Sequence, residues 1–303
     1  MHAVGKRLLN AFLEKHGYPP RLAPTTKVEK QVRGLDILVL VDGDIALLIE
    51  DKVHSGEHSN QLVRYKSVIG TQHCDRSLLP IYTKTGNQSS YFGVKEAGYV
   101  PFMRSDFLFA LRPALRETHN AVVLDFLANL ETHDAKVNLF LSAPFSKWKK
   151  EWFAWVGLYE WLQESVEDED FYWDYVSNPR GGFLGAWWHF QDWREGCSIY
   201  LQIEQEKLCF KIGTEDHHSD EDRWRLRNAF EETLRHHPAA VKLGLEKSPG
   251  RRGKYMTVAY VDVDRWMARD VEDVLDKERT LDYLSQAAAL IGMLASVSRD
   301  VSV

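Results

Sequence analysis

The first hydrophobic pattern in the chain is that of an amphipathic helix. Apolar side chains recur at intervals of three and four residues, which places them on one helix face. These side chains are Val4, Leu8, Leu9, Phe12 and Leu13. We expect this helix to end at Gly17, because Pro19 and Pro20 follow directly.

The next hydrophobic segments alternate between strand and helix patterns. The run GLDILVLVDGDIALLIEDKV predicts two strands joined at Asp42-Gly43. A helix over Glu57–Ile69 follows, and LLPIYTK and GYVPFM predict two more strands. Two further helices are expected over Asp106–Leu111 and Ala114–Leu130. The leading order, α-β-β-α-β, indicates an α/β fold in which a mixed sheet lies between layers of helices.

The second half of the chain differs in composition. All ten tryptophans lie at Trp148 or later, so we place a domain boundary within Ser142–Lys150. We expect one domain over residues 1–142 and a Trp-rich α+β domain over residues 143–303. Strands are predicted at FLGAWWHF, CSIYLQIE and KLCFKIG, the last two joined by a turn at Gln205–Glu206. A helix over Asp220–His236, a strand KYMTVAYVDV and a helix from Val271 complete this domain.

Composition limits the class of protein. With 44% hydrophobic and 27% charged residues, the chain is typical of a globular protein. No apolar run approaches the roughly 18 residues of a membrane helix, and the charged, amphipathic start is not that of a signal peptide. The three cysteines stand at unrelated spacings and form neither a disulfide framework nor a zinc motif. We therefore expect a cytoplasmic protein without a membrane segment.

Charge is distributed unevenly along the chain. The net charge is −6. Residues 1–150 contain 20 Lys+Arg and 15 Asp+Glu, a net of +5, whereas the remainder contains 18 and 29, a net of −11. A polyanion would meet less repulsion at the first half than at the second. The second half is therefore not expected to make broad contact with phosphate.

Charged residues at the ends of apolar strands suggest a chemistry for the first half. Asp36 precedes the apolar run ILVLV, and Glu50-Asp51-Lys52 follows IALLI. Side chains alternate along a strand, so Glu50 and Lys52 share a face while Asp51 points away and retains its carbonyl as a possible ligand. Phosphodiester hydrolysis requires carboxylates that hold a divalent cation and a lysine beside the attacking water. The same spacing fits a strand-end salt bridge equally well.

The length of the loop between these strands tests the arrangement. A loop of three or five residues places Asp36 directly opposite Glu50, whereas a two-residue Asp42-Gly43 turn places Asp36 opposite Ile49. We predict a loop with an odd number of residues, or a bulge that restores the same parity. An unbulged two-residue turn would exclude the site.

A helical motif downstream makes the pattern more specific. Gln61 and Tyr65 are four residues apart and share a helix face. Together, Asp36, then Glu50-Asp51-Lys52, then QLVRY resemble the PD-(D/E)xK nuclease superfamily. The similarity is greatest to its RecB-like branch and to bacterial members of uncertain role, and it covers about residues 1–140. It implies a restriction-endonuclease-like mixed sheet flanked by helices.

The resemblance also implies roles for individual residues. Asp36 and Glu50 would hold Mg²⁺ or Mn²⁺, with the Asp51 carbonyl as a third ligand. Lys52 would orient or deprotonate the attacking water, and Gln61 and Tyr65 would position the metal site or the substrate backbone. The implied function is hydrolysis of nucleic acid, DNA rather than RNA, in bacterial defence against phage or other foreign DNA.

Several alternatives stay open at this point. Many relatives have a further acidic ligand, for which Glu14 and Glu29 are candidates, although each fits a solvated surface charge better. The chain could instead be a catalytically inactive binding or scaffold protein with the same fold, or an RNA-directed nuclease. The second domain could bind a partner protein, form a dimer or restrict access to the site.

Overall fold

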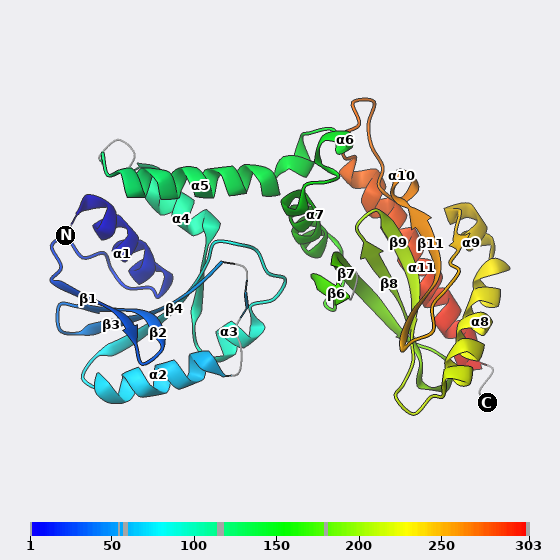
Figure 1. Cartoon of the computed structure of the whole chain (residues 1–303), viewed down its shortest axis with the longest axis horizontal. Helices are drawn as coiled ribbons and strands as arrows, with labels where there is room; N and C mark the ends of the chain where they lie inside the picture. Colours follow the sequence, from blue (N-terminus) through cyan, green and yellow to red (C-terminus); the bar gives the residue numbers. More distant parts are fainter. Residues whose placement is uncertain (1, 54, 57–59, 114–117, 179–180, 301–303) are drawn as a thin grey trace. The chain divides into compact units, whose positions relative to one another are not determined.

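The computed structural model describes residues 2–53, 55–56, 60–113, 118–178 and 181–300 (Figure 1). The chain forms two compact units, Met1–Ala135 and Lys136–Val303. None of the described helices is long and apolar enough to span a lipid bilayer.

The first unit contains a five-stranded mixed sheet in the order β1-β2-β3-β4-β5. β1, β2 and β3 pair antiparallel, whereas β3, β4 and β5 run parallel. Its elements are α1 (Ala3–Lys15), β1 (Thr26–Val32), β2 (Leu35–Val41), β3 (Ile45–Lys52), α2 (Gln61–Gln72), β4 (Ser77–Lys84), α3 (Phe92–Glu96), β5 (Val100–Met103), α4 (Arg104–Leu111) and α5 (Ala121–Val137).

Both faces of this sheet are covered by helices, as Figure 1 shows. Leu47 and Ile49 of β3 belong to a cluster with the apolar faces of α1, α4 and α5. Their neighbour Leu48 packs on the other face against Tyr65 and Ile69 of α2. Because side chains alternate along β3, this strand contributes to the hydrophobic cores on both faces of the sheet. The predicted α/β fold, a mixed sheet flanked by helices, is confirmed.

The predicted order lacked the edge strand β1, and the short helix α3 was also not predicted. β1 has the sequence TKVEKQV, and neither of its faces is fully buried. An edge strand of this kind lacks the hydrophobic alternation by which strands are found in sequences. The first residues of the predicted helix Glu57–Ile69 lie outside the described residues, and α2 begins at Gln61. The predicted start of the helix Ala114–Leu130 also lies outside the described residues. The observed helix, α5, extends to Val137.

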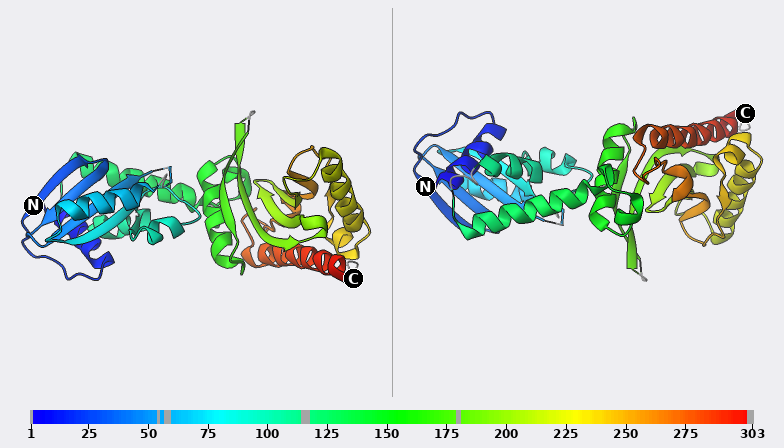
Figure 2. Two further views of the ribbon diagram at one scale, coloured as in Figure 1. Left: turned by 90° about the horizontal axis from the view of Figure 1, so that it is seen from below. Right: turned by 90° about the horizontal axis from the view of Figure 1, so that it is seen from above.

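The second unit contains a six-stranded antiparallel sheet in the order β10-β11-β9-β8-β7-β6. Figure 2 shows α11 running along one face of this sheet. Its elements are two short helices, η2 (Leu139–Leu141) and α6 (Phe145–Trp148), then α7 (Trp152–Ser165), β6 (Tyr172–Asn178), β7 (Gly181–Asp192), η3 (Arg194–Gly196), β8 (Ser198–Glu204), β9 (Lys207–Gly213), α8 (Asp220–Arg235), α9 (Pro238–Leu243), β10 (Glu246–Lys247), β11 (Tyr255–Asp262), α10 (Val263–Trp266) and α11 (Lys277–Asp300).

Several features of this unit differ from the prediction, among them the short strand β10, which was not expected. β6 lies partly in the acidic stretch where no strand was expected, and it too is an edge strand. The last helix begins at Lys277 rather than near Val271. Asp273 has a left-handed backbone with φ of 64°, which a helix does not accommodate. Asp276 then accepts a hydrogen bond from the Arg279 N–H and caps the new helix.

Gly157 allows the backbone of α7 to lie close to the backbone at Val137, which a larger residue at this position would prevent. A Cβ atom at this position would lie 1.9 Å from the carbonyl oxygen of Val137, which belongs, like α7, to the second unit. We expect Gly157→Ala to lower the free energy of unfolding of the second unit by about 1–3 kcal/mol. Tryptophan fluorescence in a urea titration reports on this unit, since all ten tryptophans lie in it. Gly253→Ala is the control, because a Cβ there has no atom within 4 Å. Equal unfolding midpoints would contradict the prediction.

Candidate active site

The loop between β2 and β3 has three residues. Val41 pairs with Ile45, so Asp42, Gly43 and Asp44 lie between the strands. Asp42 and Gly43 have φ angles of 49° and 96°, the left-handed conformations that tight hairpin loops require. The predicted odd-numbered loop is therefore confirmed.

This loop sets the register at the other end of the hairpin. Ile37 pairs with Ile49, and the next pair in the same register is Asp36 and Glu50. The alternative, in which Asp36 lies opposite Ile49, is excluded. Both carboxylates therefore lie on the face of the sheet that α2 covers, together with Leu48.

The Asp36 carboxylate is held by two donors. Its Oδ2 accepts a hydrogen bond from the Asp51 N–H at 2.9 Å, and its Oδ1 accepts one from the Gln31 side chain at 3.1 Å. Within an extended strand the N–H and C=O of one residue point to the same side, so the Asp51 carbonyl is directed toward β2. The Asp51 side chain lies on the opposite face, where its Oδ1 accepts a hydrogen bond from Thr83 at 2.7 Å.

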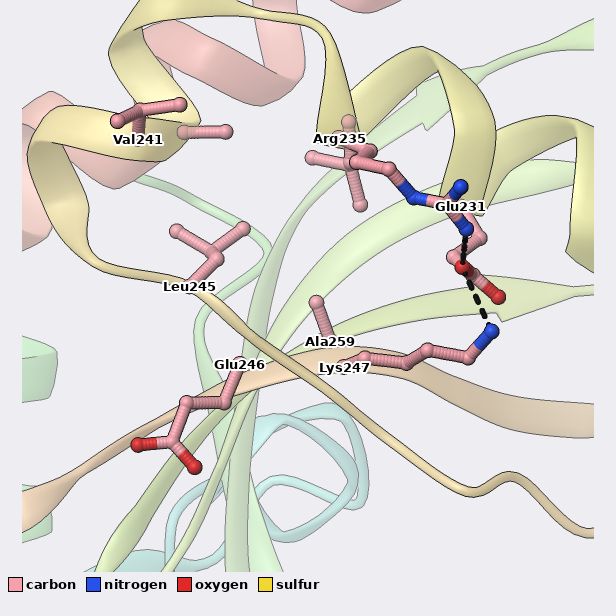
Figure 3. Close-up of a pocket in the computed structure, with 9 residues that line it drawn as sticks. Glu231, Arg235, Val241, Leu245, Glu246, Lys247 and Ala259 are labelled. Atoms are coloured by element: carbon pink, nitrogen blue, oxygen red, sulfur yellow. Dashed lines mark hydrogen bonds and ion pairs between the residues drawn. The ribbon is translucent and has the colours of Figure 1, made fainter.

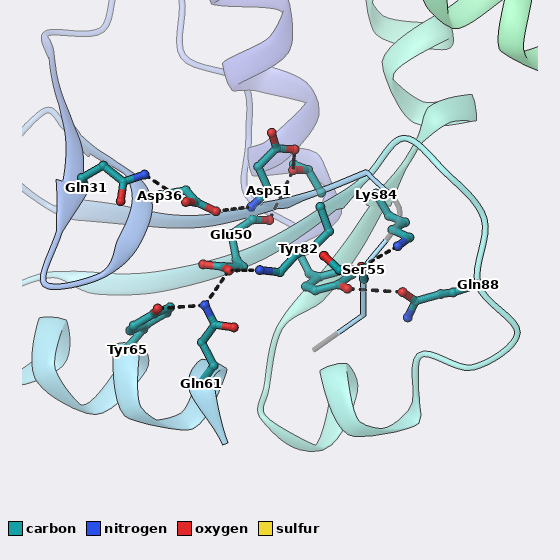
Figure 4. A network of polar contacts seen from close by, with 12 residues as sticks. Gln31, Asp36, Glu50, Asp51, Ser55, Gln61, Tyr65, Tyr82, Lys84 and Gln88 are labelled. Atoms are coloured by element: carbon teal, nitrogen blue, oxygen red, sulfur yellow. Dashed lines mark hydrogen bonds and ion pairs between the residues drawn. The ribbon is translucent and has the colours of Figure 1, made fainter. Parts of the chain in front are cut away.

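Glu50 is the most deeply buried of the candidate residues, with 1% of its surface exposed. Its Oε1 accepts hydrogen bonds from Lys52 Nζ at 2.7 Å and from Gln61 Nε2 at 2.9 Å (Figure 4). Its Oε2 is buried and, among the residues that the structure describes, has no hydrogen-bond partner. Leaving a carboxylate oxygen buried and unpaired is costly, so this atom is suited to bind a cation.

The motif residues on α2 complete this network. Gln61 Nε2 also donates to the Tyr65 hydroxyl at 2.8 Å. The Tyr65 ring packs against Gly34, where a Cβ would lie 2.9 Å from a ring carbon. Gly34 also has a φ of 93°, so the tight β1–β2 turn requires glycine for two reasons. The structure thus brings Gln61, Tyr65 and Glu50 together, and Asp36 lies on the same face.

Electrostatics at the site favour a bound cation. Burial raises the pKa of Glu50, Lys52 opposes this shift through its hydrogen bond, and the negative charge of Asp36 adds to it. Burial acts to lower the pKa of Lys52, but the hydrogen bond and charge of Glu50 and the charge of Asp36 raise it. Lys52 is therefore protonated at neutral pH. One lysine does not fully compensate two carboxylates.

The donor set fits a hard divalent cation. Asp36 and Glu50 offer carboxylate oxygens and Asp51 a carbonyl oxygen, the ligand type that Mg²⁺ and Mn²⁺ prefer. Among the described residues, no group of three or more His, Cys, Asp or Glu side chains is arranged to hold a metal ion. A site with two carboxylates suits Mg²⁺, which usually keeps several water ligands.

The two candidates for a further acidic ligand do not join this network. Glu29 on β1 forms an ion pair with Lys27 at 2.8 Å, and this hydrogen bond lowers its pKa. Its partner across the sheet is Leu38. Glu14 is exposed on α1, which packs on the face opposite α2.

Four polar residues near the site were not identified from the sequence. They are Gln31, Tyr82, Thr83 and Lys84. Tyr82 and Lys84 are the register partners of Glu50 and Lys52 on β4, and both are fully buried. The polar residues that end the segment LLPIYTK could have indicated these side chains. Lys84 ends an apolar strand, as Lys52 does, and a lysine is rarely found at such a buried position.

Two other pockets formed by the described residues do not show comparable chemistry. A cavity of about 630 Å³ lies on the other face of the first sheet, and Asp51 alone of the candidate residues borders it. In the second unit a pocket of about 130 Å³ is bordered by Glu231 (Figure 3). That carboxylate already pairs with Arg227, Arg235 and Lys247, so its charge is compensated.

Because the pKa of Glu50 is raised, the stability of the metal-free protein should change with pH in a known direction. Glutamate in an unfolded chain titrates near pH 4.3, whereas folded Glu50 binds its proton more tightly. This stabilisation is fully present below about pH 4.3 and is lost as the pH rises through the folded pKa. Relative to Glu50→Gln, which cannot titrate, we expect the wild type to lose stability as the pH rises above about 4.3.

Urea denaturation in EDTA at each pH measures this difference. Glu14→Gln, on an exposed part of α1, controls for the loss of one carboxylate. A difference between wild type and Glu50→Gln that does not change with pH would contradict the expectation.

Comparison with known proteins identifies the family. The family model of the PD-(D/E)XK nuclease superfamily matches residues 23–178, more than half of the chain. The match includes β1 to β5 and α2, which carry the site, and it continues into the second unit. No curated protein and no solved structure matched the chain. The hairpin, the parallel strands and the motif residues agree with this match, and the chain belongs to the PD-(D/E)XK nuclease superfamily.

Proposed function

We propose that this protein is a metal-dependent nuclease that hydrolyses DNA, with a site formed by Asp36, Glu50, Asp51 and Lys52. The superfamily supports a nuclease-type phosphodiesterase, and its members generally use divalent metals. The observation that carries the proposal is the buried Glu50 carboxylate. One of its oxygens lies between Lys52 and Gln61, and the other has no partner within the described part of the chain. A strand-end salt bridge alone does not account for that unpaired oxygen.

The roles follow from the contacts. Asp36, Glu50 and the Asp51 carbonyl would hold Mg²⁺ or Mn²⁺, which when bound neutralises phosphate charge and activates water. Lys52 has a raised pKa and acts through its positive charge, orienting the attacking water and stabilising developing negative charge. This assignment favours a charged Lys52 over one that removes the proton from water.

Gln61 and Tyr65 support the site rather than act on the phosphate. Gln61 donates to Glu50 and to Tyr65, which restricts the rotation of the buried carboxylate. Tyr65 is wedged against Gly34 in the neighbouring turn. They hold the Glu50 side chain in one orientation, so this side chain needs to move less when a metal ion binds.

The choice of DNA, and a role in defence against phage or other foreign DNA, follow from analogy within the superfamily. Cytoplasmic location agrees with three cysteines that form no disulfide. We assign catalysis to the first unit and contact with a protein partner or a second copy to the second. Tyr175 and Tyr255, 50% and 64% exposed, offer apolar surface for such contact.

Cleavage of labelled single- and double-stranded DNA and RNA tests the proposal. The protein is incubated with each substrate in Mg²⁺, in Mn²⁺ and in EDTA. Cutting of DNA that requires either metal supports the proposal. Cutting of RNA alone would reassign the substrate. Failure to cut any substrate, together with no metal-induced change in thermal stability, would favour an inactive binding or scaffold protein.

A further inference from the structure

Lys84, the last residue of β4, is a lysine buried without a counter-charge. None of its surface is exposed. Its ammonium donates a hydrogen bond to the Ser55 carbonyl at 2.7 Å (Figure 4). No carboxylate among the described residues lies within ion-pair distance of it. A main-chain carbonyl offers only a partial negative charge, so the lysine remains poorly compensated.

Two other lysines whose side chains are mostly removed from solvent are paired with carboxylates. Lys52 contacts Glu50 at 2.7 Å, and Lys211, 8% exposed, contacts Glu204 at 2.9 Å. Lys84 instead lies beside another cation, because its register partner on β3 is Lys52. Burial, and after it the positive charge of Lys52, lowers the pKa of Lys84 to about 8. The buried charge of Lys84 therefore destabilises the folded protein unless an anion binds next to it.

The position of Lys84 is suited to substrate contact. β3 and β4 are parallel, so Lys52 and Lys84 lie side by side at the carboxyl edge of the sheet, where α/β proteins bind ligands. Arg104 fixes the residues that follow, because its guanidinium donates to the Thr85 carbonyl at 3.1 Å and to the Asn87 side chain at 2.8 Å. The end of β4 is therefore held in place.

We propose that Lys84 is a second phosphate-binding cation, which contacts a non-bridging oxygen of the nucleic-acid backbone in place of the Ser55 carbonyl. This inference rests on the proposed nuclease function and deepens it. A phosphate oxygen carries a negative charge that compensates the buried ammonium, which the neutral Ser55 carbonyl does not. Exposed Ser55 is the described residue whose carbonyl the phosphate replaces.

The proposal predicts opposite effects of one substitution on binding and on stability. Lys84→Met keeps the length of the side chain and removes its charge. If Lys84 is retained for substrate, the variant binds nucleic acid less tightly but is more stable, because a buried uncompensated charge has been removed. If Lys84 only anchors Ser55, the variant loses a hydrogen bond and is less stable.

Binding is measured by fluorescence anisotropy of a labelled DNA duplex, with Ca²⁺ in place of Mg²⁺ to limit cleavage, over a series of salt concentrations. One lost phosphate contact lowers the slope of log K against log salt by about 0.9, and weakens binding roughly five- to tenfold near 0.1 M salt. Lys66→Met is the matched control, since Lys66 is half-buried and also donates to a carbonyl, that of Ala97, outside the site. We expect the control to keep the wild-type slope.

Thermal unfolding without DNA is the second readout. We expect Lys84→Met to raise the melting temperature by about 2–4 °C. An unchanged salt slope, or a lower melting temperature, would overturn the assignment of Lys84 while leaving the nuclease intact, provided that Lys52→Met still abolishes cleavage. If the wild type neither binds nor cleaves DNA or RNA, both proposals fail together.

Discussion

Lys52→Met is expected to lower kcat for metal-dependent cleavage by about a hundred- to ten-thousandfold, the effect of removing a charge that stabilises a transition state. The raised pKa of Lys52 keeps this side chain charged at neutral pH. Its ammonium is fixed by Glu50 and is only 15% exposed, so bulk water screens it weakly. KM should change much less than kcat, because the interaction is formed mainly in the transition state.

Steady-state cleavage of the substrate that the wild type prefers measures both constants. Lys27→Met is the matched control, because Lys27 lies on the same sheet but is 73% exposed and pairs with Glu29. We expect the control to retain wild-type kcat. Unchanged kcat in Lys52→Met, with the fold intact by circular dichroism, would exclude Lys52 from the chemistry.

The second large effect concerns metal binding. Asp36→Asn keeps the size and shape of the side chain but removes one of the two carboxylate charges, and with it one of the two hydrogen-bond acceptors. A metal ion that binds only the folded wild type stabilises it by about 2.7 kcal/mol at a concentration one hundred times Kd. We expect Mn²⁺ to raise the melting temperature of the wild type, and this increase to be absent or strongly reduced in Asp36→Asn.

Differential scanning fluorimetry over a Mn²⁺ titration measures this shift without any nucleic acid. Asp44→Asn is the control, because Asp44 lies in the loop at the opposite end of the same hairpin and pairs with Arg21. We expect it to respond to Mn²⁺ like the wild type. A full metal response in Asp36→Asn would place the metal site elsewhere.

Strands were predictable in proportion to the apolar surface that they bury. β2 and β3 were predicted because their apolar runs pack on helices from both sides. The strands missing from the prediction were β1, β6 and β10, and each lies at or next to a sheet edge. Such strands are stabilised mainly by hydrogen bonds to one neighbour, and backbone hydrogen bonds leave little trace in side-chain identity. Sheet order at the edges therefore required the structure.

Gln31 illustrates the same limit at the site. It lies at the end of β1 opposite Asp36 and donates to that carboxylate. Its backbone has a φ of 54°, which is uncommon for a non-glycine residue and is maintained by the hairpin around it. Glu29, two residues earlier, was the candidate taken from this segment, because an acid is a more obvious metal ligand than an amide. The structure instead shows Glu29 paired with Lys27.

The sequence by itself determined the family, the mixed α/β fold and the residues that form the candidate site. These features depend on short-range spacing: two residues place Glu50 and Lys52 on one strand face, and four place Gln61 and Tyr65 on one helix face. Tertiary structure alone decided which segments meet. Parallel pairing of β3 with β4 puts Lys84 beside Lys52, a contact that the sequence analysis did not predict. Such contacts join residues far apart in the chain, and they are set by packing of the whole sheet rather than by any local pattern.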